Sequence, residues 1–246
     1  MTHSARVLFA ALLAWSCAGC SRTPLRLDEG DPSSSSPDAL DPECPGATDA
    51  APVLGGRIRD FLAAHPDFEG FIGDDTGIVL PELGDDGLPV YAGLDGNPST
   101  SGQASFDQWY RDVPGVNQGA NLAIELQLSP YGWVVDRPEF FPIDGQLLGN
   151  EGSEHNFHFT VELHTTFRHH GGEVFHFQGD DDLWAFVDGQ LALDLGGVHG
   201  TQDGSVDIDS LGLDLDGVYP LDLFYAERHT SASVLRVRLE RFDLCE

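Results

Sequence analysis

Short apolar segments with period-two alternation fill the second half of the chain and constrain its fold most strongly. Phe157, Phe159, Val161 and Leu163 alternate with polar residues, the pattern of a half-buried strand. Similar short segments lie at 175–178, 183–187, 191–193, 206–215, 219–225 and 234–239. The pair at 188–189, Asp-Gly, predicts a hairpin turn between two of them. Many short strands at this spacing predict an all-β fold, an antiparallel β-sandwich or barrel.

One or two short helices are expected before these strands. Residues 58, 61, 62 and 65 are apolar or aromatic and follow the i, i+3, i+4, i+7 spacing of a helix face. The sequence therefore predicts a short helix over 57–64 that ends before Pro66. The grouping of Phe106, Trp109 and Tyr110 indicates a second short helix.

The charge of the chain is strongly negative. Its 246 residues include 41 Asp and Glu but 12 basic residues, all of them Arg, for a formal net charge of −29. Nucleic acids and anionic membrane surfaces need a cationic face on their partner, so neither is expected to bind. Binding of cations is compatible with this charge, although most of the carboxylates must simply form a solvated surface.

The first 20 residues have the features of an export signal. A weakly basic start (His3, Arg6) precedes an apolar run over 7–15, which is too short for a membrane-spanning helix. Cys-Ala-Gly-Cys follows at 17–20 and resembles a bacterial lipobox, with Cys17 where Leu is usual. We expect lipidation at Cys20, with plain secretion as the alternative and Cys17 as a weaker candidate.

Three segments are expected: a signal peptide over 1–20, a disordered Asp-, Ser- and Pro-rich tether over 21–52, and a folded domain over 53–246. Ser21 after the lipidated cysteine favours the outer membrane of a Gram-negative cell. The expected location is therefore the outer membrane or cell surface of a bacterium, and otherwise the extracellular space.

Two further cysteines flank the folded part. Cys44 and Cys245 lie at its two ends, and in an exported protein this favours one disulfide between them. Two free thiols are the alternative.

Asp180, Asp181 and Asp182 stand together between two strand-like segments, with no basic residue beside them. Adjacent carboxylates repel one another unless solvent or a bound cation screens them. Oxygen ligands packed this densely suit calcium. A hydrated acidic turn is the alternative.

The ten histidines do not form a zinc pattern, because no three or four of them have converging spacing. Exposed strand histidines are expected instead, among them His158, His164, His169 and His170. His199 either lines the acidic site or caps a turn. The sequence contains no Gly-x-Ser-x-Gly, no phosphate-binding glycine loop and no Cys-His nucleophile context. Pairs of carboxylates could serve a glycosidase, but they are too abundant here to indicate one, and an enzyme is not expected.

Several motifs in a fixed order resemble the fibro-slime domain, which in turn resembles the broader protective-antigen-type β-sandwich. The resemblance covers about 57–242. It rests on IRDFLAAHPDFE (58–69), SFDQWY (105–110), FFP (140–142), NFHFT (156–160), FQGDDDLW (177–184), DG (188–189), DLGGVH (194–199) and FYAERHTSAS (224–233). It implies an antiparallel sandwich of jelly-roll or protective-antigen-like type.

In lectin-like members of the broader group, two adjacent Asp joined by a cis peptide bond hold a calcium ion that coordinates sugar hydroxyls. The resemblance places this pair on Asp180 and Asp181. Asp182 then stands where Gly is frequent, and Val234 stands where a fourth ligand, Asn, is expected. The second binding loop would fall on 227–233, which adds these ligand-binding candidates to Asp182 and His199: Glu227, Arg228, His229, Ser231 and Ser233.

These observations together predict a surface-anchored, calcium-dependent module for carbohydrate binding or adhesion. Its partner would be an extracellular polysaccharide or glycan, and surface proteins are further candidates. Trp184 is expected to pack in the core rather than stack on a sugar. The alternative is a structural matrix or envelope protein whose acidic hairpin stabilises the fold and whose partner is another protein.

Overall fold

The computed structural model describes residues 44, 51–93 and 98–245. The chain divides into two units, Met1–Asp41 and Pro42–Glu246, and every described residue lies in the second. The expected signal peptide over 1–20, the lipidation site Cys20 and most of the expected tether over 21–52 lie outside the described residues.

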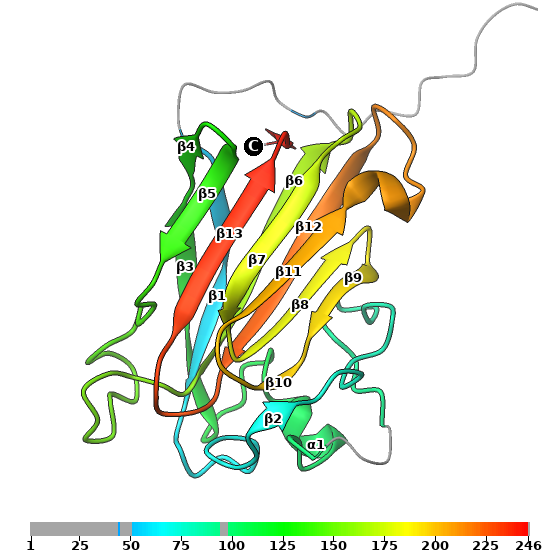
Figure 1. Cartoon of the computed structure of the whole chain (residues 1–246). Helices are drawn as coiled ribbons and strands as arrows, with labels where there is room; N and C mark the ends of the chain where they lie inside the picture. Colours follow the sequence, from blue (N-terminus) through cyan, green and yellow to red (C-terminus); the bar gives the residue numbers. More distant parts are fainter. Residues whose placement is uncertain (1–43, 45–50, 94–97, 246) are drawn as a thin grey trace, which may run out of the picture. The chain divides into compact units, whose positions relative to one another are not determined.

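Two antiparallel sheets form a β-sandwich, as expected (Figure 1). The larger has the order β3-β1-β6-β12-β8-β9, with β14 also pairing with β6. Its strands are β1 (Val53–Phe61), β3 (Asn117–Glu125), β6 (Phe159–Arg168), β8 (Asp182–Val187), β9 (Gln190–Leu195), β12 (Val218–Glu227) and β14 (Asp243–Cys245).

The smaller sheet has the order β11-β7-β13-β5-β4. Its strands are β4 (Gln127–Ser129), β5 (Gly132–Arg137), β7 (Val174–Asp180), β11 (Gln202–Asp207) and β13 (Val234–Glu240). A separate short pair joins β2 (Gly73–Asp74) to β10 (Gly197–Val198). The described helices are α1 (Gln103–Phe106) and the 3-10 helix η1 (Ile208–Leu211). The strand expected over 206–215 is therefore shorter than predicted, because β11 ends at Asp207 and η1 follows it.

The main core lies where alternating side chains of the two sheets meet. Phe159 and Val161 from the large sheet belong to the same buried cluster as Phe175 and Phe177 from the small one. In a second cluster, residues that precede β3 in the chain pack against the large sheet. Its members are Ile78, Val79, Phe106, Trp109 and Tyr110 from the segments before β3, and Trp184, Phe186, Phe224 and Ala226 from the sheet. Strand β8 contributes to both clusters, so it is buried on both faces, and Trp184 packs in the core.

The predicted hairpin at 188–189 joins β8 to β9. Asp188 and Gly189 have φ of 51° and 71°, and Val187 pairs with Gln190 across the turn. Positive φ at both central residues characterises the two-residue turn that fits strand twist, and Asp-Gly adopts it readily. The Asp-Gly pair between two alternating segments therefore predicted this turn correctly from local sequence alone.

The helix predicted over 57–64 is wrong. Residues 53–61 form β1, which lies between β3 and β6 in the large sheet. Its two faces are both covered: Ile58 faces the core, while Arg59 is also buried and pairs with Glu162 at 3.3 Å. A strand buried on both faces loses its period-two pattern, and the remaining spacing imitated that of a helix. The second expected helix is present only in part: the single turn α1 ends at Phe106, and Trp109 and Tyr110 lie in the turn that follows.

A disulfide joins Cys44 to Cys245, as expected, across a sequence separation of 201 residues. Cys245 lies on β14, opposite Thr166 of β6. Among the described residues, no helix is long and apolar enough to cross a membrane.

Two neighbouring glycines of β1 provide a test of the sheet packing. A Cβ on Gly56 would lie 1.8 Å from the carbonyl oxygen of Glu162, whereas a Cβ on Gly55 meets nothing within 4 Å. Overpacking costs about 1–3 kcal/mol, and the backbone here cannot move without breaking the β1–β6 pairing. We expect Gly56→Ala to lower the free energy of unfolding by more than about 2 kcal/mol and Gly55→Ala by less than about 1 kcal/mol. Urea unfolding measures both, and equal losses would contradict this packing.

Candidate functional site

The acidic triplet lies where the chain passes from one sheet to the other. Strand β7 of the small sheet ends at Asp180, and β8 of the large sheet begins at Asp182. The peptide bond between Asp180 and Asp181 is cis. All three side chains are buried, and Asp182 is completely so. The triplet is therefore an interior junction of the sandwich rather than a hydrated surface turn.

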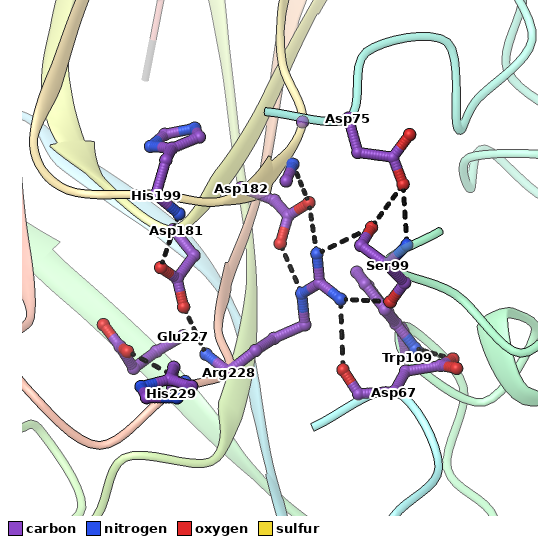
Figure 2. Close-up of polar contacts among 12 residues, drawn as sticks. Asp67, Asp75, Ser99, Trp109, Asp181, Asp182, His199, Glu227, Arg228 and His229 are labelled. Atoms are coloured by element: carbon purple, nitrogen blue, oxygen red, sulfur yellow. Dashed lines mark hydrogen bonds and ion pairs between the residues drawn. The ribbon is translucent and has the colours of Figure 1, made fainter. Parts of the chain in front are cut away.

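Asp182 is paired with Arg228, and both side chains are fully buried (Figure 2). The Nε of Arg228 donates to Oδ2 of Asp182 at 2.6 Å, and Nη2 donates to Oδ1 at 3.0 Å. The backbone N–H of Gly197 donates to the same Oδ1 at 2.6 Å. This two-point geometry is the strong form of a carboxylate–guanidinium pair, and it engages both side chains inside the protein.

The remaining donors of Arg228 hold segments from the first half of the chain. Nη1 donates to the carbonyl oxygens of Asp67 at 3.0 Å and Ser99 at 2.7 Å, and Nη2 donates to Oγ of Ser99 at 3.2 Å. The guanidinium carbon lies 4.6 Å from the ring centroid of Trp109, whose Nε1 donates to Oδ2 of Asp67 at 2.9 Å. Figure 2 shows these contacts converging on one guanidinium.

Asp180 and Asp181 receive hydrogen bonds from elsewhere in the fold. Oδ1 of Asp180 accepts from the backbone N–H of Val234 at 2.7 Å, and Oδ2 accepts from the hydroxyl of Thr201 at 3.1 Å. Oδ1 of Asp181 accepts from the N–H of His199 at 3.1 Å, and Oδ2 accepts from that of Arg228 at 3.0 Å. Each oxygen thus accepts from one donor, and within the described part of the chain no basic side chain donates to any of these four oxygens.

Glu227 adds a third carboxylate to this pair. It is fully buried, and its Oε2 accepts from the hydroxyl of Tyr225 at 3.2 Å, which also lies 3.0 Å from Oγ of Ser233. Burial raises the pKa of Glu227 well above its usual range, and the nearby charges of Asp181 and Asp180 raise it further. Burial, followed by the charge of Asp182, raises the pKa of Asp181 to about 8. The surroundings therefore disfavour the ionised forms of Asp181 and Glu227.

The predicted second loop lies beside this cluster. Its backbone brings Arg228 N and Val234 N to the two aspartates, while Thr230 and Ser231 at its tip are exposed and His229 is half-buried. Among the predicted candidates, Glu227 and Ser233 point into the interior network. His229 and Ser231 remain at the accessible rim.

Glu69 fixes this loop and was not singled out from the sequence. Its Oε1 accepts from the N–H of Thr230 at 2.8 Å and from the hydroxyl of Thr230, and it lies 2.8 Å from Nε2 of His158. Burial raises the pKa of Glu69, but the hydrogen bonds from Thr230 and His158 outweigh it and lower the pKa below its usual value. Glu69 and Asp67 lie within the motif over 58–69. Local spacing does not predict their contacts with the loop over 227–233, because their partners Thr230 and Arg228 are each 161 residues away.

Two open questions of the sequence have structural answers. The ring of His199 makes hydrogen bonds only within its own loop, to the carbonyl oxygens of Gly200 at 3.0 Å and Leu195 at 3.3 Å. His199 reaches the acidic site through its backbone N–H. Val234 likewise contributes its backbone N–H to Asp180, and its aliphatic side chain offers no metal ligand.

The expectation that the histidines are exposed is wrong for His158 and His169, which are both buried. His169 forms a possible metal-binding group with Glu173 and Asp209, whose ligand atoms lie within 4.8 Å of one another. Glu173, however, accepts from the N–H groups of His170 at 2.6 Å and Gly171 at 3.0 Å, as well as pairing with His169 at 2.8 Å. Through these bonds Glu173 stabilises the turn between β6 and β7. We therefore assign this group of residues a structural role rather than a metal-binding one.

Comparison with protein families finds one matching domain in the part of the chain that carries this site. Residues 143–245 match the PA14 domain. The match extends over β6 to β14 and includes Asp180, Asp181 and the loop over 227–233. The expected membership of the fibro-slime family is wrong, because the matching family is PA14 and the curated relatives are psi proteins. The string FQGDDDLW (177–184), on which that expectation rested in part, lies within the PA14 match.

Curated relatives come from Dictyostelium discoideum. Protein psiD is 40% identical over 205 residues, which is 75% of this chain and 40% of psiD. Protein psiR is 38% identical over 219 residues, which is 78% of this chain and 22% of psiR. The chain therefore spans less than half the length of these relatives.

Solved structures with the PA14 fold or an adhesin fold share low identity with this chain. A PA14 sugar-binding domain from an RTX adhesin is 17% identical, with a TM-score of 0.28, over 37% of this chain and 52% of that domain. The epithelial adhesin 6 A domain of Candida glabrata, solved in complex with Galb1-3GlcNAc, is 14% identical, with a TM-score of 0.36, over 82% of this chain and 91% of that domain.

Arg228 provides the sharpest test of the site's internal support. Removing one partner of a buried ion pair leaves an uncompensated charge and costs about 3–5 kcal/mol. We expect Arg228→Gln to lower the free energy of unfolding by that amount, as measured by urea denaturation. Arg111→Gln removes an exposed pair with Asp86 (2.6 Å) and should cost less than about 1 kcal/mol.

A double variant separates buried charge from lost packing. Asp182→Leu combined with Arg228→Met removes both charges of the pair and leaves neither without its partner, so it should recover part of the stability that Arg228→Gln loses. A double variant less stable than Arg228→Gln would show that the other hydrogen bonds of Arg228 matter more than its pairing with Asp182.

Proposed function

We propose that this chain is a non-enzymatic, calcium-dependent carbohydrate-binding or adhesion module, with Asp180 and Asp181 as the calcium ligands. The observation that carries the proposal is that two adjacent buried carboxylates, Asp180 and Asp181, accept hydrogen bonds from backbone N–H groups and a hydroxyl, but from no basic side chain among the described residues. Asp180 and Asp181 each lie within the PA14 match, and Glu227 lies close enough for both to raise its pKa.

The donor set fits a hard divalent cation. The guanidinium of Arg228 is committed to Asp182, so the charges of Asp180, Asp181 and Glu227 have no comparable partner. A cation would lower the free energy of keeping these carboxylates ionised in the interior, because an opposite charge favours the ionised form. Carboxylate oxygens are also the ligands that calcium prefers.

Calcium commonly takes six to eight oxygen ligands, and two aspartates supply only part of that number. Bound calcium would supply open coordination positions at which hydroxyl oxygens of a sugar replace water. The exposed tip of the loop over 227–233 borders the cluster, and His229 and Ser231 are placed there to contact such a ligand. The side chain of Val234 does not add a ligand, so we expect weak single sites whose strength rises through multivalency.

A second function has its own support. Each carboxylate oxygen of Asp180 and Asp181 already accepts a hydrogen bond from the protein, as in an acidic turn that stabilises the fold. Such a chain would act as a structural matrix or envelope protein, and its partner would be another protein.

Asp180→Asn is the best variant for testing the calcium site. The asparagine oxygen can still accept from Val234 N–H, and its amide can donate to the hydroxyl of Thr201, which is also able to accept. Calcium at about 100 times its dissociation constant should stabilise the wild type by about 2.7 kcal/mol, a rise of about 5–10 °C in melting temperature. Asp180→Asn should lose this rise.

The matched control is Asp188→Asn, which removes one charge from the exposed hairpin turn and should retain the full calcium response. The same three proteins are then applied to a glycan array in calcium and in chelator. Glycan binding that needs both calcium and Asp180 supports the proposal. A calcium response without any glycan binding favours the structural alternative, and no calcium response in the wild type contradicts a calcium site.

We also propose that the chain is exported and lipidated at Cys20, with the outer membrane or cell surface of a bacterium as its location. The disulfide between Cys44 and Cys245 supports export, because disulfides persist in oxidising compartments. Expression in a Gram-negative host with a labelled fatty acid should label the wild type but not Cys20→Ser. Label in Cys20→Ser that disappears in Cys17→Ser would move the anchor to Cys17, and no label in any variant would indicate plain secretion.

A further inference from the structure

The outer face of the five-stranded sheet carries an open hollow of about 540 Å³. Strands β5, β7, β11 and β13 form its floor (Figure 1). Its volume falls within the range of about 300–1,000 Å³ that is usual for small-molecule sites. The side chains that matter most are Tyr131, His176, Arg236 and Arg238, which line it together with Asp136 and Asp203.

The hollow is lined by two arginines as well as two aspartates, Asp136 and Asp203. Only 12 basic residues accompany 41 acidic ones, yet Arg236 and Arg238 lie two residues apart on β13 and share its outward face. Arg236 is paired, since its Nε donates to Oδ1 of Asp136 at 2.8 Å. Arg238 has a looser partner, Glu240, whose Oε2 lies 3.7 Å from its Nη2.

Two buried nitrogen atoms of residues that line the hollow have no hydrogen-bond partner among the described residues. They are Nε of Arg238 and Nε2 of His176. The nearest acidic oxygen to the His176 atom is Oε2 of Glu240, at 3.4 Å. Neither atom exposes surface to solvent, so a ligand in the hollow would instead contact the outer part of Arg238, whose side chain is 37% exposed.

Tyr131 supplies a flat apolar surface beside these donors. Its side chain is 67% exposed, and the guanidinium carbon of Arg238 lies 6.0 Å from its ring centroid. An exposed aromatic ring can cover the apolar face of a sugar. Asp136, Asp203 and Gln178 provide acceptors and donors around it for hydroxyl groups, and Gln178 Nε2 donates to Oδ1 of Asp203 at 2.8 Å.

We propose that this hollow binds an acidic saccharide, one that bears a carboxylate or a sulfate group. Arg238 receives the anionic group, because a guanidinium matches the planar geometry of two anionic oxygens. Tyr131 contacts the sugar ring. None of these residues belongs to the acidic cluster at Asp180, Asp181 and Glu227, so this binding is independent of calcium and of the proposed calcium site.

The test measures binding of the whole chain by isothermal titration calorimetry in excess chelator, which silences any calcium site. The probes are an oligogalacturonate, a sulfated dextran oligomer and a neutral dextran oligomer. We expect the wild type to bind at least one acidic probe and not the neutral one. Arg238→Gln and Tyr131→Ala should each weaken that binding at least tenfold.

Arg137→Gln is the matched control, because Arg137 lies on β5, is exposed and does not line the hollow. It should leave the affinity within about twofold of the wild-type value. Asp180→Asn should also bind normally, which separates this site from the calcium proposal. Preference for oligogalacturonate identifies the anionic group as a carboxylate, and preference for sulfated dextran identifies it as a sulfate.

Three results would overturn the proposal: no binding of either acidic probe, equal binding of the neutral probe, or equal losses in Arg137→Gln and Arg238→Gln. Both test residues are partly exposed, so their variants should melt near the wild-type temperature. If one of them fails to fold, the other carries the test.

Discussion

Burial of the Arg228 guanidinium makes the rest of the site possible. It is costly to remove a guanidinium from water, and the cost is met here by two bonds to Asp182, two backbone carbonyls and a hydroxyl. Those partners come from β8 and from segments around residues 67 and 99, which are distant in sequence. One side chain therefore ties loops from the first half of the chain to the sheet that carries the acidic junction.

The pairing of Arg228 with Asp182 also affects the electrostatics at the neighbouring Asp181. Because Asp182 takes the side chain of Arg228, Asp181 receives only its backbone N–H, and the pKa of Asp181 rises to about 8 through burial and the charge of Asp182. Three consecutive carboxylates thus divide into one that is neutralised internally and two that are not. This division, rather than the number of acids, separates Asp182, which is bonded to Arg228 within the fold, from Asp180 and Asp181, the two residues of the calcium proposal.

The strands of the core could be predicted from sequence, because alternation at Phe159 and Val161 and the Asp188-Gly189 turn depend on local chemistry. The strand over 53–61 could not, since its second face is covered by groups such as Asp112 that lie 53 residues from Arg59. The acidic triplet was located, but the role of Asp182 depends on a partner 46 residues away. The pairing of Asp182 with Arg228 follows from the register that sets Ala226 opposite Asp182. The spacing of residues within one strand does not predict its register with a strand that is distant in the sequence.

The disulfide also determines how force would pass through the sandwich. Cys245 lies opposite Thr166 near the end of β6, while Thr160 near its beginning is opposite Ala226, which pairs with Asp182. A ligand held at the acidic junction and a pull applied through Cys44 would therefore act near opposite ends of β6. Such a load runs along the strands, so the interstrand hydrogen bonds, which lie across them, would share it in parallel instead of opening one after another.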